Sequence, residues 1–345
     1  MKILVTGASG FIGSFLCEEG LRQGHEVWAG VRRSSSRRYL QDARLKFAEL
    51  DFSSPDTLAG QLAVHQQEHA GWDVVIHCAG VTKCPREEDF ELNNHLYTRH
   101  LAEGLMQAGI APRQFVYLSS LSVFGPIREE VAHPDFPQGA PCLYAPITGH
   151  DTPRPNTAYG RSKLRAEQYL QSLGDRLPTV IFRPTGGYGP RERDYFLMAK
   201  SIQGHTDFSV GFRRQEITFI YVKDLASAIY RAVEKGISNR AYFVSDGGIY
   251  ESRAFSDLIQ RELGNPWVLR IKSPLWLLKL ISYVAGWGAS LVGKTCTLNK
   301  DKYQIMKQRN WRCDISPLVN ELGFRAEYLL ERGVKETMAW YKKEG

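Results

Sequence analysis

The sequence GASGFIG, residues 7–13, decides the fold of this chain. It lies between a short apolar run, residues 1–6, which predicts a buried strand, and a helical pattern that runs to Gln23. A second apolar run, residues 26–31, completes a strand–helix–strand unit. In such a unit glycine permits the tight turn and the close approach of backbone to a pyrophosphate, and the helix N-terminus attracts the phosphates. The unit therefore predicts a dinucleotide site whose phosphate loop contains Gly7, Gly10, Phe11, Ile12 and Gly13.

Four more apolar runs follow this unit and are expected to be strands: residues 45–50, 72–77, 114–119 and 179–183. Helical patterns separate most of them, and this alternation predicts a parallel sheet that helices cover on both faces. The expected fold class is therefore α/β, a doubly wound parallel sheet of the Rossmann type with a smaller C-terminal α/β lobe.

Beyond residue 183 the alternation becomes irregular. Residues 216–221 and 241–245 are expected to be strands and residues 222–235 a helix, and these elements are expected to return to the first domain. We therefore expect a cofactor-binding domain of residues 1–183 plus 215–248. The substrate-binding lobe is expected to consist of residues 184–214 plus 249–345, with the binding site between the two.

Composition excludes several classes of protein. The chain has 345 residues, of which 43% are hydrophobic and 23% charged, so it can bury a core and is not disordered. A mean hydropathy of −0.32 excludes a polytopic membrane protein. The six cysteines have no CxxC and no paired Cys/His spacing, so we expect no metal site. Nothing at the N-terminus resembles a signal peptide, which together with scattered cysteines predicts a cytoplasmic protein with free thiols.

The residues after the second strand bear on the choice of cofactor. NAD-binding units place an Asp or Glu at the end of this strand to bind the ribose 2′-hydroxyl. Here Val31 has that position, and Arg32 and Arg33 follow it. Two guanidinium groups without a carboxylate favour a 2′-phosphate, so we predict NADP over NAD. The alternative is that both are ordinary surface arginines.

The same basic run bears on nucleic acid. Net charge is +7, and the one dense cluster of cations is Arg32, Arg33, Arg37 and Arg38. No aromatic residue is interleaved with it, and it lies in no recognisable nucleic-acid module, so we expect a small-molecule substrate and no nucleic-acid partner.

Tyr159 and Lys163 are candidate catalytic residues. They are four residues apart at the start of a helical run, residues 159–173, so they share one helix face. A nearby ammonium stabilises phenolate and is expected to lower the tyrosine pKa, which makes a general acid or base. Ser119 and Ser120 end a predicted strand, where ligands bind in open α/β sheets, and a hydroxyl there can donate to a substrate oxygen.

Five motifs, TGASGFIG, YLSSLSVFG, YGRSK, RPTGGYGP and YVKDLASAI, have the order and approximate spacing seen in one family. With them the chain resembles the extended short-chain dehydrogenase/reductase family of NAD(P)-dependent epimerases and dehydratases. The resemblance implies a Ser–Tyr–Lys catalytic set, in which the tyrosine moves the proton and the lysine holds the nicotinamide ribose. By its position before Gly125, the serine of this set is Ser120. A homodimer is a further expectation from the family.

The resemblance also implies further cofactor contacts. Residues at the end of the third strand would face the adenine, residues after the fourth strand would line the cofactor, and Pro184 would lie near the nicotinamide amide. The implied contacts are Asp51, Phe52, Cys78, Ala79, Gly80, Asn94, Tyr159, Lys163 and Pro184.

Departures from the family pattern indicate the branch. Leu121 and Ser122 stand where dehydratases carry an Asp–Glu pair, which argues against elimination of water. Gly186 replaces an Asn, and Ile217 an Arg, of enzymes that bind nucleotide sugars. Four arginines that could substitute for the missing cation are Arg191, Arg193, Arg213 and Arg214. The chain therefore looks more similar to the 3β-hydroxysteroid dehydrogenase and dihydroflavonol reductase side of the family.

An apolar run, residues 274–293, has one charged residue, Lys279. It would cover an apolar substrate pocket, pack the lobe or touch a membrane surface peripherally. The long segment 125–159 would border the cleft and contribute to substrate selection. These features favour an NADP-dependent oxidoreductase for a bulky, mostly apolar secondary alcohol or ketone, of steroid, flavonol or isoprenoid type. The alternatives are a nucleotide-sugar epimerase or reductase and a dinucleotide sensor without chemistry.

Overall fold

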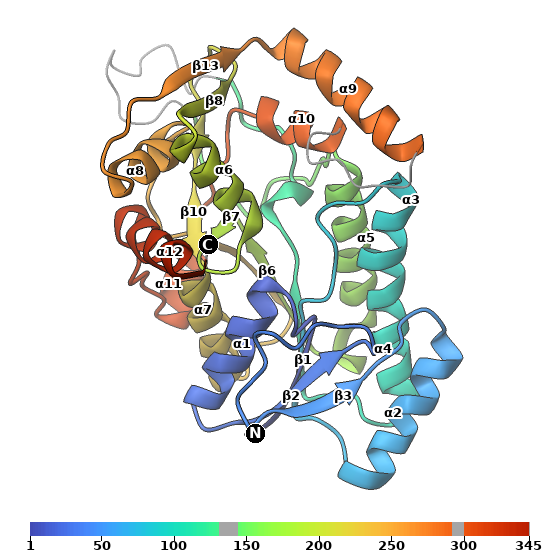
Figure 1. Cartoon of the computed structure of the whole chain (residues 1–345). Coiled ribbons are helices and arrows are strands. Elements are labelled where there is room, and N and C mark those ends of the chain that lie inside the picture. Colours follow the sequence, from blue (N-terminus) through green and yellow to red (C-terminus); the bar gives the residue numbers. More distant parts are fainter. Residues whose placement is uncertain (131–143, 292–299, 345) are drawn as a thin grey trace.

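The computed structural model describes residues 1–130, 144–291 and 300–344, and the side chains of residues 284–291 lie outside the description (Figure 1). A seven-stranded parallel sheet forms the centre of the cofactor domain. In sheet order the strands are β11 (Arg240–Val244), β6 (Thr179–Pro184), β5 (Gln114–Leu118), β4 (Val74–His77), β1 (Lys2–Thr6), β2 (Glu26–Val31) and β3 (Lys46–Glu49). The order reverses at β1 and β4, so a crevice opens beyond their carboxyl ends.

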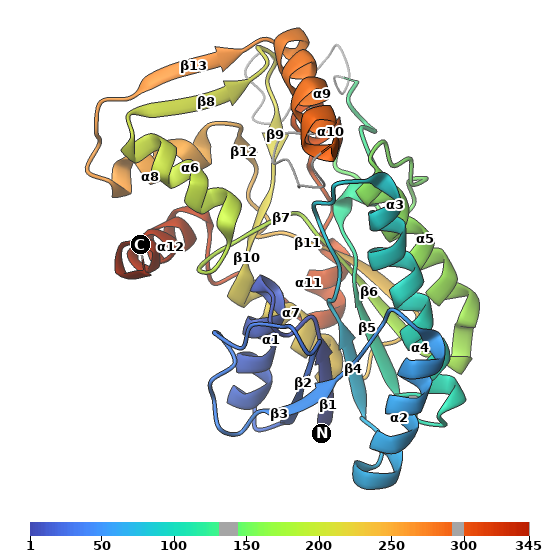
Figure 2. The same ribbon diagram turned by 45° about the vertical axis from the view of Figure 1, so that its right-hand side comes forward.

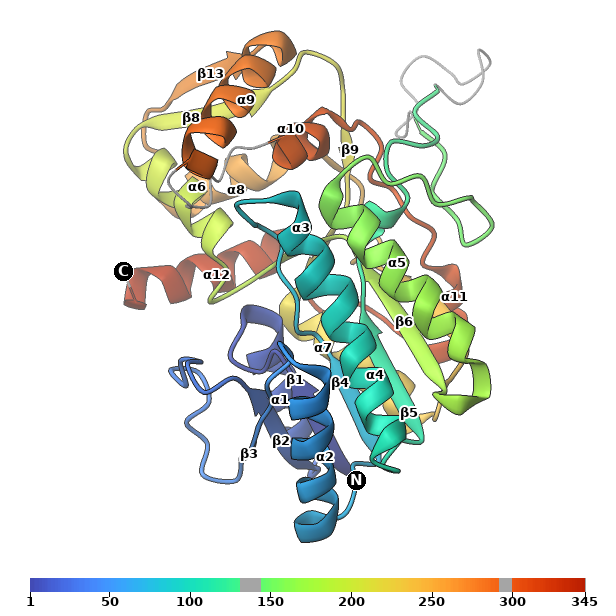
Figure 3. The same cartoon turned by 90° about the vertical axis from the view of Figure 1, so that its right-hand side faces the viewer.

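Helices cover both faces of this sheet, as Figures 2 and 3 show. One face packs against α1 (Phe11–Arg22), α7 (Val222–Glu234) and α11 (Ser316–Leu322). The other face packs against α2 (Pro55–His69), α4 (Tyr97–Gln107) and α5 (Ala158–Leu173). The central strands are buried on both sides, which explains their continuous apolar sequence. The predicted α/β doubly wound fold is confirmed.

The C-terminal lobe contains three two-stranded ribbons. They pair β7 (Gly186–Tyr188) with β10 (Phe219–Tyr221), β8 (Thr206–Val210) with β13 (Leu269–Ser273), and β9 (Glu216–Ile217) with β12 (Tyr250–Glu251). Helices α6 (Arg193–Gln203), α8 (Ala254–Glu262) and α12 (Leu330–Glu344) pack around an aromatic core with Tyr188, Phe219 and Phe255.

The predicted strand 216–221 is in fact two strands, and neither joins the central sheet. Thr218 separates them, and its hydroxyl donates to the Trp311 carbonyl oxygen over 2.6 Å. The helix and the strand that follow, α7 and β11, do return to the cofactor domain as expected.

The apolar run 274–293 contains the whole of α9 (Leu275–Leu291). This helix packs on α10 (Lys300–Lys307) at the end of the lobe farthest from α2 (Figures 1 to 3). Within the described ranges, no helix has both the length and the apolar character needed to cross a membrane.

Short helical pieces complete the chain. Residues Glu87–Phe90 form α3, which continues through a π-helical segment, Glu91–Leu96, into α4. Two 3₁₀ turns, Leu121–Val123 and Gly174–Arg176, follow β5 and α5.

Candidate active site

A cavity of about 470 Å³ lies at the crevice where the strand order reverses. Its walls come from the phosphate loop, the ends of β2, β4, β5 and β6, and the first two turns of α5. Fourteen of the predicted site residues line it: Gly7, Gly10, Phe11, Ile12, Gly13, Arg32, Phe52, Cys78, Ala79, Gly80, Ser120, Tyr159, Lys163 and Pro184. The structure therefore brings most of the candidate set to one place.

The tight turn of the phosphate loop and its close packing on the backbone around it require glycine at two positions. Gly7 has a φ of +68°, and a Cβ there would lie 2.7 Å from the Ala79 backbone nitrogen. A Cβ on Gly13 would lie 2.2 Å from the Gly7 carbonyl oxygen. Helix α1 begins at Gly10 without a side-chain cap, so its first N–H groups point to the cavity unclaimed by a capping side chain. This cradle fits a dinucleotide pyrophosphate.

At the adenosine end of the cavity, Val31, Arg32, Ser35 and Phe52 form the wall. The Arg32 backbone nitrogen donates to the Ser35 hydroxyl over 3.0 Å, which fixes the turn. Neither Arg32 nor Arg33 forms an ion pair or side-chain hydrogen bond with any residue that the structure describes. Both guanidinium groups are exposed and can receive an anionic ligand.

Three predicted cofactor residues do not line the cavity: Arg33, Asp51 and Asn94. The Asp51 carboxylate instead accepts from the backbone and the hydroxyl of Ser53, and these bonds hold its pKa below the usual range. Asn94 is fully buried beneath the wall, and its amide bonds both the N–H and the carbonyl oxygen of Val81. It holds the loop after β4 in place, and Val81 takes the position in the wall.

The catalytic candidates meet at the centre of the cavity. Thr157 caps the start of α5, so Tyr159 and Lys163 lie on its first two turns and point toward the end of β5. Burial raises the pKa of Tyr159 to about 12, and a hydrogen bond with Ser120 offsets only part of this. Burial also lowers the pKa of Lys163 to about 8. The Lys163 ammonium donates to the Leu118 carbonyl oxygen over 2.8 Å.

This differs from the expectation that Lys163 lowers the pKa of Tyr159. The spacing of the two residues is as predicted, but the loss of water around the buried phenol dominates its pKa. Ser120 does face Tyr159, and its hydroxyl also donates to Ser122 over 3.1 Å. The neighbouring Ser119 lines the cavity too, and its buried hydroxyl has no hydrogen-bond partner among the described residues.

A buried ion pair joins α5, the helix that carries Tyr159 and Lys163, to strand β6 of the sheet. Glu167, one turn after Lys163 on α5, is bound by Arg183 of β6, with Nη2 and Oε2 2.6 Å apart. Both side chains are less than a tenth exposed. The guanidinium also lies over the rings of Phe124 and Phe243. The pair fixes the distance between α5 and the sheet, and hence the place of Tyr159.

Helix α10 of the lobe also reaches the catalytic helix. The two carboxylate oxygens of Asp301 accept from the backbone nitrogens of Ala158 and Tyr159, each over 3.0 Å. These are N–H groups of the first turn of α5, which have no partner within the helix. A lobe residue therefore holds the backbone of Tyr159, the candidate catalytic tyrosine, and no sequence motif around Asp301 predicts this contact.

Other polar residues in the cavity wall or close to it in the chain have no motif that predicts them. Glu192 lines the wall beside Thr185 and Gly187, and burial raises the pKa of its carboxyl group. Asp194 pairs with Lys83 and, with 3.5 Å between Nζ and Oδ2, with Lys302. No sequence spacing links these residues, because they come from three separate segments.

The arginines considered as diphosphate ligands lie outside the cavity wall. Arg191 is held against α1, where it bonds Ser14 and Glu18 over 2.8 and 2.6 Å. Arg214 pairs with Glu251, and Arg213 is exposed. Ile217 is paired with Tyr250 in the β9–β12 ribbon.

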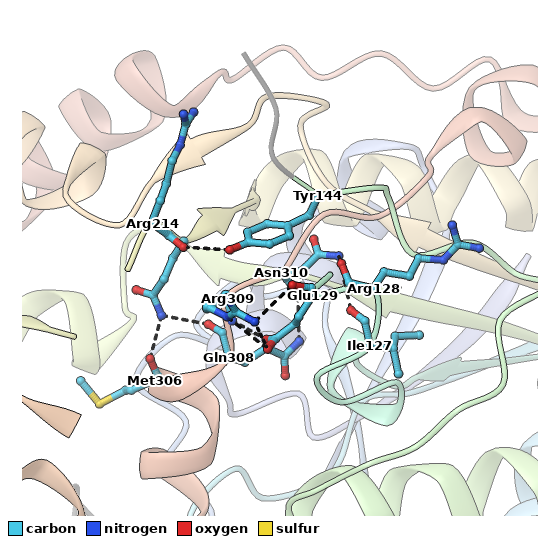
Figure 4. Close-up of polar contacts among 10 residues, drawn as sticks. Ile127, Arg128, Glu129, Tyr144, Arg214, Met306, Gln308, Arg309 and Asn310 are labelled. Carbon is cyan, nitrogen blue, oxygen red and sulfur yellow. Dashed lines mark hydrogen bonds and ion pairs between the residues drawn. The ribbon is translucent and has the colours of Figure 1, made fainter. Parts of the chain in front are cut away.

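A polar clasp joins the lobe to the segment that follows Ser120 (Figure 4). The Asn310 amide donates to the carbonyl oxygens of Ile127, Arg128 and Ala145, over 3.4, 3.0 and 3.0 Å. Beside it, the Glu129 carboxylate accepts from the Arg309 backbone over 2.6 Å. The predicted loop 125–159 is thus tied to the lobe on both sides of residues 131–143, which lie outside the described part of the chain.

The remaining interactions of this clasp involve the loop residues directly before β9. The Gln215 amide donates to the carbonyl oxygens of Met306 and Gln308, over 2.7 and 2.8 Å. The Tyr144 hydroxyl donates to the Arg214 carbonyl oxygen over 3.3 Å.

Within the described residues, no group of three or more His, Cys, Asp or Glu side chains could hold a metal ion.

Comparison with known proteins agrees with this geometry. Residues 3–245 match the NAD dependent epimerase/dehydratase family. The uncharacterized UDP-glucose epimerase YtcB of Bacillus subtilis (strain 168) is 27% identical over 77% of this chain and 89% of its own. The sterol-4-alpha-carboxylate 3-dehydrogenase, decarboxylating, of Dictyostelium discoideum is 24% identical over 88% of this chain and 94% of its own.

The fold has close counterparts among solved structures. The UDP-glucuronic acid 4-epimerase from Bacillus cereus, in complex with UDP-glucuronic acid and NAD, superimposes with a TM-score of 0.75. The two chains cover each other completely and are 20% identical, so this likeness concerns the fold.

Fold and cavity together define an enzyme that uses a dinucleotide. The family match identifies its kind: the chain belongs to the NAD dependent epimerase/dehydratase family, which is the extended short-chain dehydrogenase/reductase family that its motifs predict. It is an NAD(P)-dependent oxidoreductase or epimerase.

Proposed function

We propose that the protein is an NADP-dependent oxidoreductase that acts on a bulky, mostly apolar secondary alcohol or ketone. The observation that carries the choice of reaction is the convergence of Ser120, Tyr159 and Lys163 in one cavity beside the phosphate loop. A bound nicotinamide would accept or donate the hydride. Gly7, Gly10 and Gly13 would leave room for the pyrophosphate, and Pro184 would lie at the nicotinamide end.

The roles of the three catalytic residues follow from their surroundings. The Ser120 hydroxyl would donate to the substrate oxygen, and the Tyr159 hydroxyl would transfer its proton. Lys163 is buried one turn from Tyr159, and it would hold the ribose and stabilise the phenolate once the ammonium turns from Leu118. A phenol with a pKa of about 12 is a weak acid and is almost wholly protonated near neutral pH, so the charge of Lys163 is what would make it usable there.

The preference for NADP is supported by the adenosine end. Arg32 and Arg33 are exposed directly after β2, and their guanidinium groups have no partner among the described residues. Val31 stands where the usual carboxylate would be. An apolar substrate is supported by Ile217, which stands where an arginine is expected, and by the engagement of Arg191 with α1. Among the described residues, Arg32 is the one arginine in the cavity wall. The sterol dehydrogenase of Dictyostelium is a relative whose name fits this substrate class.

A nucleotide-sugar epimerase or reductase is the second candidate. Lys83 and Lys302 converge on Asp194 near the substrate end, and two ammonium groups are suited to a diphosphate. The likeness to YtcB supports this reading as well. A dinucleotide sensor is disfavoured because Tyr159 and Lys163 are both present.

We also propose that the enzyme acts in the cytoplasm and forms a homodimer.

Turnover by the purified protein tests the proposal. NADP⁺ and NAD⁺ are each offered with hydroxysteroids, flavanols and other apolar alcohols, and in parallel with UDP- and dTDP-sugars. Reduction of NADP⁺ by an apolar alcohol is the expected result. Conversion of a nucleotide sugar without any reaction of the alcohols would replace the first candidate by the second.

Two sets of variants test the assigned roles. Tyr159→Phe should lower kcat by at least about 10² because the proton donor is removed, while Tyr169→Phe, on the same helix but bound to Glu103, should keep full activity. Arg32→Ala with Arg33→Ala should raise KM for NADP⁺ about tenfold or more and leave KM for NAD⁺ unchanged. Arg37→Ala, in the same loop, is the control. Full activity of Tyr159→Phe would reject the mechanism.

A further inference from the structure

Helix α9 exposes its apolar side chains and buries a polar one. Trp276, Leu280 and Tyr283 recur at the spacing of one helix face, and Trp276 and Leu280 are 69% and 57% exposed. The inward face holds Leu278 and Ser282, and the buried Ser282 hydroxyl has no hydrogen-bond partner in the described part of the chain. A surface helix of a water-soluble protein has the opposite polarity.

The apolar surface continues onto the neighbouring β8–β13 ribbon, which lies beside the start of α9 in all three views (Figures 1 to 3). Phe208 and Ile271 are paired residues of this ribbon, and both are exposed. Phe212, in the loop after β8, is 69% exposed. The Leu275 side chain lies next to Gly211 and joins the helix to that loop. Single exposed apolar residues are ordinary, but a continuous group of them marks an interaction surface.

Cations predominate around this apolar surface, because the acidic residue of the ribbon, Asp207, is buried and paired with Arg253. Between Glu262 and Asp301 the sequence contains no acidic residue. Lys272 lies 5.1 Å from the Phe212 ring centre, and Lys279 and Lys300 lie 6.0 and 5.2 Å from that of Tyr283. None of these three ammonium groups forms an ion pair with a described residue. The surface thus combines aromatic rings with free cations.

We propose that this face, formed by the exposed side of α9 and the outer side of the β8–β13 ribbon, docks the enzyme on an anionic lipid surface. Aromatic and aliphatic side chains of an interfacial helix enter the boundary between headgroups and acyl chains, and lysines beside them attract anionic headgroups. A protein partner would need acidic groups and a matching apolar surface, whereas a lipid surface supplies both without a fixed shape. Helix α9 would lie in the plane of the membrane and would not cross it.

Vesicle binding by the full chain tests this proposal. The protein is sedimented with vesicles of phosphatidylcholine alone and of phosphatidylcholine with phosphatidylglycerol. We expect binding to the anionic vesicles, which weakens with added salt and is much lower on phosphatidylcholine alone. Trp276→Ser with Leu280→Ser should lower the partition coefficient about tenfold or more. Val64→Ser, an equally exposed apolar residue on α2 at the far end of the molecule, should leave it unchanged.

Two further variants separate charge from apolar contact. Lys272→Glu with Lys279→Glu should weaken binding to anionic vesicles and keep the apolar side chains. Trp276→Phe should bind as the wild type does, but lose part of the fluorescence quenching by brominated lipid, because Trp276 is the indole expected to enter the bilayer.

Three results would overturn the proposal. The first is absence of vesicle binding by the wild-type protein. The second is binding by the Trp276→Ser/Leu280→Ser variant at the wild-type level. The third is a wild-type dimer that binds no vesicles and becomes a monomer in that variant, since a second copy of the chain would then be what covers this face.

Discussion

Helices α5 and α9 have nearly the same length, 16 and 17 residues, and both break the usual polarity of a surface helix. Helix α5 buries two charged residues, Lys163 and Glu167, in the interior. Helix α9 exposes large apolar residues, among them Trp276 and Leu280. The reversal in α5 is satisfied within the molecule, and the reversal in α9 is not.

The partners of the buried charges make this clear. Lys163 donates to a backbone carbonyl, and Glu167 is bound by Arg183. A buried charge costs several kcal/mol unless it is paired, so such an arrangement is kept where it has a use, here beside the cavity. An exposed apolar side chain costs little in the free protein. The comparison teaches that the buried charged residues of α5 are balanced within the molecule and fit the proposed chemistry, whereas the exposed apolar residues of α9 are unbalanced and fit the proposed docking surface.

Breaking the internal ion pair should have the largest effect on stability. Arg183→Met leaves the Glu167 carboxylate buried without its partner, and we expect the free energy of unfolding to fall by about 3–5 kcal/mol. Urea denaturation measures this. Arg183→Met with Glu167→Leu should recover most of the loss. Arg99→Met, which breaks the exposed pair with Glu103, should change the free energy of unfolding by less than about 1 kcal/mol.

Removing the charge of Lys163 should stabilise the protein while it abolishes turnover. Burial lowers the pKa of this ammonium from 10.5 to about 8. Below pH 8 the amine is protonated in both states, and the charged form is less stable in the folded protein than in the unfolded chain, which lowers the free energy of unfolding. Lys163→Met should therefore be more stable than the wild type at pH 7, by on the order of 2–3 kcal/mol.

The pH dependence separates this effect from simple repacking. Wild-type stability rises from pH 8 toward 10.5 as the folded protein loses the proton, so the advantage of Lys163→Met should shrink over that range and be gone above it. Urea titrations at pH 7, 9 and 10.5 measure the difference. A constant advantage at all three pH values would mean that packing, and not charge, is its cause.

Local features made much of the fold readable from the sequence. The strands and the phosphate loop follow from continuous apolar runs and from glycines with a defined task, such as Gly7 and Gly13. The sequence predicts one strand over 216–221 because most of its residues are apolar or aromatic. Its division at Thr218 depends on Trp311, which lies far along the chain.

Site residues that lie in a sequence motif could be predicted, whereas site residues that the fold brings in from segments without a motif could not. Tyr159, Lys163 and Ser120 follow from spacing, whereas Glu192 and Asp301 reach the site from segments without any motif. Asn94 was assigned to the cofactor but supports Val81 from beneath, because burial is not visible in a motif. The pKa of Tyr159 was misjudged for the same reason: the spacing showed the ammonium but not the loss of water.

Helix α10 packs on α9 and contacts the first turn of α5 through Asp301. Removing this contact should lower stability less than Arg183→Met does. Asp301→Ala removes the acceptor from the first turn of α5, so we expect about 1 kcal/mol lower stability and a severalfold lower kcat, with KM for NADP⁺ unchanged. Asp301→Asn should recover part of kcat, because one amide oxygen can still accept. Asp314→Ala, which removes the acceptor of the Ser316 N–H on α11, should cost similar stability and leave kcat intact.

The smallest effect on stability should come from a substitution on the exposed face of α9. This substitution tests most directly whether the apolar residues of that face are unpartnered within the molecule. Leu280→Ser changes an exposed side chain and should alter the free energy of unfolding by less than about 0.5 kcal/mol. Leu278→Ala, two residues earlier and 6% exposed, should cost about 2 kcal/mol or more. Thermal and urea denaturation measure both variants. If Leu280→Ser proved as costly as Leu278→Ala, the outer face of α9 would already be packed within the molecule, and its polarity would need no external partner to explain it.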